Sequence, residues 1–182
     1  VIANQWSARD LWIRRTLASG DRALLIGLAR ELVAQEKIDW QLLNHLVERI
    51  AIESPQESAT LILKADAGDV NDSYLSMRQV DLLRAWVRGV RKSRQSVIKV
   101  TEKFPGPLKE SCQNLILLAM ETARNSEFDA HLRANSLLLA ADFGRARESL
   151  RELVSDESPP RVRVAALPLN LRNDQEWTRG YL

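Results

Sequence analysis

Apolar residues recur along this chain with the period of an α-helix. Most segments place an apolar residue every three or four positions, and short turns rich in Gly, Pro or Asp separate the segments. Because this spacing sets one apolar stripe along a helix, the pattern predicts an all-α protein. No alternation of apolar and polar residues is long enough to indicate a strand. About ten helices are expected in one domain that spans residues 1–182.

The first helices are bounded by glycine and aspartate. A helix over residues 5–19 is expected to end at Gly20, which suits a left-handed C-terminal position. Asp21 is expected to cap a second helix that ends near Glu36, and Asp39 a third. The residues expected to face the core in the second and third helices are Leu24, Leu25, Leu28, Leu32, Val33, Leu42, Leu43, Leu46, Val47, Ile50 and Ala51.

The middle of the chain is expected to hold one short and one long helical segment. Residues 54–57 (Ser-Pro-Gln-Glu) have the composition of a capping box and are expected to open a helix through Ala59, Leu61, Ile62 and Leu63. Residues 66–72 are expected to form a loop. A long segment then begins at Ser73 and is expected to break near Gly89 or Ser93. Its expected core residues are Leu75, Leu82, Leu83, Trp86, Val87 and Val90.

The last third of the chain repeats itself. Residues 104–107 (Phe-Pro-Gly-Pro) are expected to break the helices, and a helix over residues 108–125 follows. Residues 132–139 (LRANSLLL) then return 30 positions later as residues 162–169 (VRVAALPL). The matched pairs are Arg133 with Arg163, Leu137 with Leu167, and Leu139 with Leu169. Pro168 is expected to kink or end the second helix.

A pair of helices recurring at this period is typical of an α-solenoid. Residues 158–167 (SPPRVRVAAL) resemble the first helix of a HEAT-type repeat, a member of the armadillo-type helical-repeat class. The segment around Arg133 is a looser copy, and residues 10–19 (DLWIRRTLAS), which include Arg14, are similar again. The resemblance implies a right-handed superhelix of antiparallel helix pairs that serves as an interaction or scaffold module.

A narrower resemblance concerns the parent protein. The opening around Arg14, the long helical middle and the closing repeats are similar to the helical segment of large exported bacterial dehydrogenase-like proteins. In those proteins, common in planctomycetes and their relatives, the segment lies between a β-propeller and a c-type haem domain. The resemblance implies a periplasmic or exported multidomain protein, of which this chain is a fragment. The first residue, Val1, favours the same interpretation.

Composition excludes few partners. The formal net charge of +2 gives no overall preference for nucleic acid or for an anionic membrane, and no apolar run reaches the roughly 18 residues of a membrane-spanning helix. The lone cysteine, Cys112, excludes an internal disulfide. Proteins, or neighbouring domains of the same chain, are therefore the expected partners.

The sequence offers no catalytic or metal-binding constellation, so we expect no enzymatic activity and no cofactor. His45 and His131 lie far apart, without a Cys, His or carboxylate at metal-ligand spacing. Cys112 lies in an apolar run and is expected to be an inert core thiol. The tryptophans are expected to fill the core, or to mark docking against a neighbouring domain if exposed; they are Trp6, Trp12, Trp40, Trp86 and Trp177.

One charged stretch, residues 84–103, leaves two interpretations open. Its cations are Arg84, Arg88, Arg91, Lys92, Arg94, Lys99 and Lys103. A solvated helix face, partly neutralised by Asp81 and Glu102, fits a scaffold. Alternatively, Arg84, Arg88 and Arg91 share one face and repel one another, so they would form an anion-binding stripe that suits a nucleic-acid backbone.

Overall fold

The computed structural model describes residues 20–65, 74–145, 153 and 158–173, and every regular element in these residues is a helix. The all-α prediction is therefore confirmed for this part of the chain. The helices are α2 (Arg22–Val33), α3 (Trp40–Glu53), α4 (Pro55–Ala65), α5 (Met77–Lys92), α6 (Val97–Glu102), α7 (Gly106–Arg124), α8 (Ala130–Asp142) and α10 (Pro160–Asn173). The helix expected over residues 5–19, with Arg14, and the loop expected over residues 66–72 lie outside the described residues.

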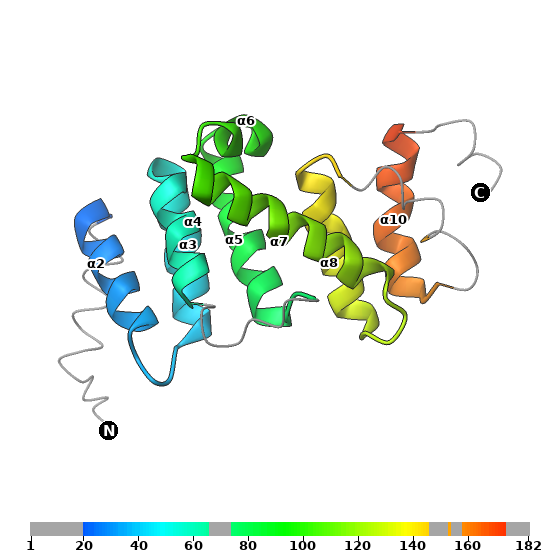
Figure 1. Cartoon of the computed structure of the whole chain (residues 1–182), viewed down its shortest axis with the longest axis horizontal. Helices are drawn as coiled ribbons and strands as arrows, with labels where there is room; N and C mark the ends of the chain where they lie inside the picture. Colours follow the sequence, from blue (N-terminus) through cyan, green and yellow to red (C-terminus); the bar gives the residue numbers. More distant parts are fainter. Residues whose placement is uncertain (1–19, 66–73, 146–152, 154–157, 174–182) are drawn as a thin grey trace, which may run out of the picture.

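The helices form two layers (Figure 1). One layer, which we call the first layer, holds α3, α5, α8 and α10, each packed against the next. The second layer holds α2, α4 and α7, which pack on the first and also contact one another in order. Helices within a layer run in the same direction and neighbours across the layers run in opposite directions (Figure 1). The short α6 lies beyond the end of α5.

Aspartate caps place the first two described helices as the sequence predicts. The Asp21 carboxylate accepts hydrogen bonds from the amides of Ala23 and Leu24, and Asp39 accepts one from Leu42. Gly20 has a φ of 64°, in the left-handed region that favours glycine. The helix α2 ends at Val33, three residues before the expected end, and the Leu24 side chain is exposed rather than in the core.

The capping box lies at a different place from the one predicted. The Ser54 hydroxyl is buried without a hydrogen-bond partner, and the Glu57 carboxylate accepts from Arg30 at 3.2 Å instead of reaching back to the cap. Pro55 still opens α4, because a first-turn amide needs no partner within the helix. The reciprocal pair forms at Ser76 and Gln79, where each side chain accepts from the other residue's amide.

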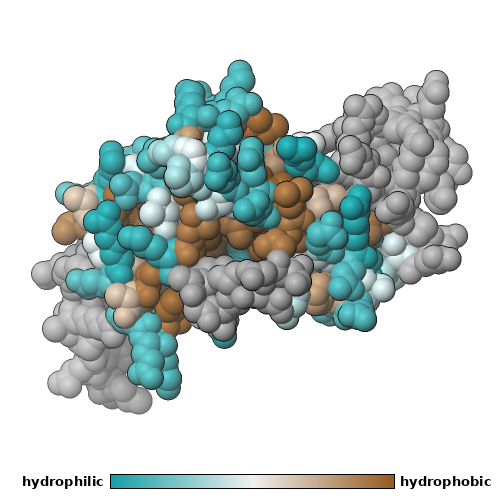
Figure 2. Space-filling model, in the orientation of Figure 1, coloured by the Kyte–Doolittle hydropathy of each residue, from teal (hydrophilic) through white to brown (hydrophobic). Residues whose placement is uncertain are grey.

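Trp86 lies at the centre of the main core. Its ring is buried, stacks on Phe143 with centroids 5.9 Å apart, and donates from Nε1 to the carbonyl of Pro55 at 2.8 Å. Phe104 meets the same ring edge-on. The expected core residues of α5 are all buried, and α5 runs through Gly89 to end at Lys92. Figure 2 shows apolar residues gathered across the middle of the face that it draws.

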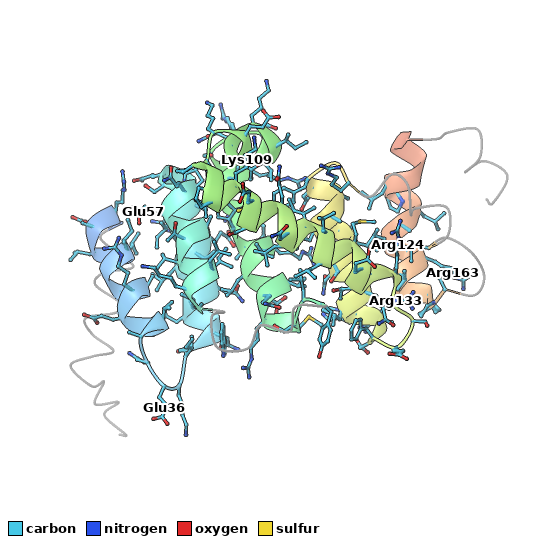
Figure 3. All side chains as sticks on the ribbon, viewed as in Figure 1. Glu36, Glu57, Lys109, Arg124, Arg133 and Arg163 are labelled. Carbon is cyan, nitrogen blue, oxygen red and sulfur yellow. The ribbon has the colours of Figure 1, made fainter. Side chains whose placement is uncertain are left out.

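The two repeat copies are equivalent in position but differ in burial. Arg133 and Arg163 are each the fourth residue of their helices, near the lower ends of α8 and α10 in Figure 3. Leu137 and Leu139 are fully buried, as expected. Their counterparts in α10, Leu167 and Leu169, are only partly buried and pack against a smaller core cluster.

Pro168 does not end its helix. The helix α10 continues past it to Asn173, so the expected early end does not occur. Proline has no amide hydrogen, and Pro168 therefore cannot donate to the carbonyl of Val164, four residues before it. The residues around it pack into a second, smaller core cluster with α7 and α8, which consists of Ala123, Leu137, Leu153, Val162 and Ala166.

Candidate binding surface

Four cations of the predicted basic stretch form one solvent-facing row on α5, which we call the α5 stripe: Arg84, Arg88, Arg91 and Lys92. The other sides of α5 are buried, because this helix lies between α3 and α8 in the first layer and packs on α4 in the second. The stripe therefore lies along the middle of the first layer, within reach of polar side chains on both neighbouring helices.

On the α3 side, one carboxylate engages two cations of the stripe. Glu48 accepts a hydrogen bond from Arg88 Nε at 2.8 Å and from Lys92 Nζ at 2.5 Å. Gly89 makes this approach possible, since a Cβ there would lie 2.3 Å from the carbonyl oxygen of Glu48 and 2.6 Å from the Cβ of Ala51. Burial works to raise the pKa of Glu48, but the hydrogen bonds from Lys92 and Arg88 outweigh it and lower the pKa.

On the α8 side, the remaining arginines meet a polar row. Arg91 forms a 2.5 Å ion pair with Asp142, and Arg84 donates to the side-chain oxygen of Asn135. Asn135 also lies 3.1 Å from a ring nitrogen of His131. Here burial prevails: it raises the pKa of Asp142, although the positive charges of Arg91 and Arg84 act to lower it.

The acids that meet the stripe are not the expected ones. Under the scaffold interpretation, the stripe was expected to be partly neutralised by acids such as Asp81 and Glu102, or to be solvated. Neither acid forms an ion pair with the described residues, and the carboxylates that pair with the stripe are Glu48 and Asp142 on neighbouring helices. Those two carboxylates lie 40 and 51 residues from Arg88 and Arg91, so no local pattern could have identified them. Gly89, expected as a possible helix break, was the one local signal of the close α3–α5 contact.

The rest of the basic stretch lies beyond the stripe. Arg94, Lys99 and Lys103 are exposed around α6, and they form no ion pair with the residues that the structure describes. Arg94 has a φ of 59°, a left-handed conformation at the turn between α5 and α6. The seven predicted cations therefore divide into four that bond to side chains of neighbouring helices and three that have no ion-pair partner among the described residues.

A groove of about 660 Å³ opens between α8 and α10, next to the stripe. Its apolar wall is formed by Ala134, Leu138, Val164, Ala165, Pro168 and Leu169. Its charged or polar lining consists of Arg91, Asp142, His131 and Arg161. Val164 is 68% exposed and is the most exposed large apolar side chain among the described residues. No motif in the sequence marked this groove, because it forms where two repeat helices lie side by side.

The other candidate residues have structural positions. Cys112 is buried, and burial raises its pKa to about 11, so the thiol is protonated and unreactive at neutral pH. His45 is exposed on α3. Three or more His, Cys, Asp or Glu side chains do not gather into a metal site anywhere in the described part of the chain. Of the helices described, none is long and apolar enough to span a membrane.

The repeat arginine and the tryptophans also serve packing. Arg133 is buried and donates from Nε to the carbonyl of Ala123 at 3.0 Å, so it caps the last turn of α7 with a positive charge. Trp86 fills the core, and Trp40 is half-buried beneath the guanidinium of Arg78 at 5.1 Å. The other three tryptophans lie outside the described residues.

Comparison with protein-family models, with curated proteins and with solved structures found no match to this chain.

Proposed function

We propose that this chain is a HEAT-like α-solenoid that acts as a non-catalytic interaction or scaffold module of a larger, exported bacterial protein. Two layers of helices, with neighbours antiparallel across the layers, support the repeat interpretation. So does the equivalent placement of Arg133 and Arg163 in α8 and α10. Solenoids of this kind present an extended layer of helices, and their function lies in what that layer binds.

One observation supports a scaffold most directly: the α5 stripe is engaged within the protein. Glu48 binds Arg88 and Lys92, and Asp142 binds Arg91. A stripe that followed a phosphate backbone would need these cations free to replace the counterions of the nucleic acid. Here they form ion pairs that connect α5 to α3 and α8 instead.

Nucleic-acid binding is the second candidate, and one observation favours it. The exposed cations Arg94, Lys99 and Lys103 lie close in sequence and have no carboxylate partner among the described residues. If this protein binds a phosphate backbone, these three residues are the cations that we expect to contact the phosphates. The α5 stripe, which the sequence analysis identified as the candidate anion-binding stripe, is less available because Glu48 and Asp142 pair with its cations.

A salt titration with labelled duplex DNA separates the two candidates. A scaffold should bind DNA only non-specifically, at roughly 10⁻⁴ to 10⁻⁶ M near physiological salt. Two variants carry the same change in net charge: Arg84, Arg88 and Arg91 together replaced by Gln, and Arg94, Lys99 and Lys103 together replaced by Gln. Sub-micromolar affinity that either triple substitution abolishes, with a log–log salt slope smaller by about 0.9 per lost phosphate contact, would overturn the scaffold proposal.

A further inference from the structure

The groove between α8 and α10 has the size and lining of a ligand site. Its volume of about 660 Å³ lies within the roughly 300–1,000 Å³ of known ligand pockets. Its wall is apolar and includes the exposed Val164 and the half-buried Leu138. An apolar wall of this extent favours a partner that brings apolar side chains.

Pro168 lies at this wall, inside α10. Because proline has no amide hydrogen, the carbonyl of Val164 does not receive the hydrogen bond that an unbroken helix would give it. Val164 and Pro168 both line the groove.

The charges at the groove favour an acidic partner. The charged side chains that line it, among the residues described, are Arg91, Arg161 and the single carboxylate of Asp142. Arg84 adds its positive charge near the same carboxylate. The lining therefore holds two guanidinium groups and one carboxylate, and this excess of positive charge complements a negatively charged ligand.

We infer that the groove between α8 and α10 binds a short acidic peptide segment that carries bulky apolar side chains. The apolar side chains pack on Leu138, Val164 and Leu169, and the acidic side chains face the exposed Arg161. This inference rests on the proposed function, because it names the chemistry of the partner that the module binds. A nucleic-acid strand matches the positive charge but leaves the apolar wall uncovered.

Three fluorescein-labelled peptides of 12 residues test the inference by fluorescence anisotropy on the full chain. The first carries Glu and Leu at helical spacing. The second replaces each Glu by Lys, and the third replaces each Leu by Ser. We expect the first peptide to bind at least about tenfold more tightly than either of the others, because both the charge and the apolar contacts contribute.

Surface variants locate the site. Val164→Glu is expected to weaken binding of the first peptide about tenfold, since it places a negative charge on the apolar wall. Leu117→Glu is the matched control: Leu117 is also an exposed apolar residue, at 57%, but it lies on α7 and does not line the groove. Arg161→Gln should weaken binding about threefold, and Asp142→Asn should strengthen it about threefold, because the groove loses the carboxylate of Asp142.

The results separate this inference from the proposed function. Equal binding of the first peptide to wild type, Val164→Glu and Leu117→Glu would overturn the inference, as would equal binding of the three peptides. If DNA binding is meanwhile weak and unaffected by both triple Gln substitutions, the scaffold proposal stands and only the groove assignment is lost. Tight DNA binding that a triple substitution abolishes overturns the scaffold proposal itself.

Discussion

Two contacts between neighbouring helices of the first layer have opposite characters. Between α3 and α5 the backbones meet closely, because Gly89 presents no side chain to the carbonyl of Glu48. Between α8 and α10 the side chains leave a groove of about 660 Å³. The comparison shows how one layer can serve two purposes. A glycine at the contact gives a closed structural joint, and larger side chains with a proline leave a surface that a partner can occupy.

Core packing shows the same contrast. The closed region shares one large core, centred on Trp86, that extends from α2 to α8. Among the residues that the structure describes, the open end has a smaller cluster of five buried residues, with members from α7, α8 and α10. We therefore expect the two regions to differ in their tolerance of substitutions.

The largest expected effect tests the repeat at the open end. Leu137 and Leu167 are each the eighth residue of their helices, but Leu137 is fully buried and Leu167 half-buried. Leu137→Ala should lower the free energy of unfolding by about 2–5 kcal/mol, because it leaves a cavity in a packed core. Leu167→Ala should cost about 1 kcal/mol, since part of its surface already faces solvent. Urea denaturation measures both, and equal losses would show that α10 packs as tightly as α8.

This difference in burial also marks a limit of the sequence. Periodicity identified the helices, and Asp21, Asp39 and residues 104–107 located their ends. The same periodicity placed Leu137 and Leu167 alike, because it records which side of a helix is apolar and not what covers that side. The burial of each leucine depends on the helices that pack on it. Both α7 and α10 pack on α8 and contribute to the cluster around Leu137.

Glycine substitutions give the next effect and test the closed contact directly. Gly89→Ala should destabilise the fold by about 1–3 kcal/mol, because the added Cβ would lie 2.3 Å from a backbone oxygen that is held in α3. Gly27→Ala is the matched control, since Gly27 lies inside α2 with nothing within 4 Å of an added Cβ. It should stabilise the protein by about 0.5–1 kcal/mol through helix propensity. Thermal or urea unfolding that gives both substitutions the same sign would contradict the close packing of α3 on α5.

The sequence predicted the cations of the candidate surface but not the carboxylates that pair with them. The run of cations from Arg84 to Lys92 was evident, and so was their shared helix face. The carboxylates that bind them were not, because Glu48 and Asp142 reach the stripe from other helices. A run of cations in the sequence shows where positive charge lies along the chain. The distances between helices determine whether those cations form ion pairs within the protein or remain available to a partner.

The smallest expected effect compares the two carboxylates of the stripe. Glu48 has a lowered pKa in the folded protein, so its contribution to stability is present above the ordinary value of 4.5 and is lost as the pH falls through the folded pKa. Asp142 has a raised pKa, so its contribution is present below the ordinary value of 3.8 and is lost as the pH rises through the folded pKa. As the pH rises through their pKa values, Glu48 therefore increases the stability of the fold and Asp142 decreases it.

Substitution by the neutral amides separates these contributions. Glu48→Gln should lower the free energy of unfolding at neutral pH by about 0.5–1 kcal/mol, a modest amount because Arg88 and Lys92 are more than half exposed. The loss should vanish in acid, where Glu48 is protonated. Asp142→Asn should be neutral or slightly stabilising at neutral pH, because it removes a carboxylate that is only 18% exposed and leaves Arg91 free to face solvent. Urea denaturation at neutral and acidic pH measures both variants. A loss at neutral pH for Asp142→Asn as large as that for Glu48→Gln would show that the α5–α8 ion pair stabilises the first layer as much as the α3–α5 pair does.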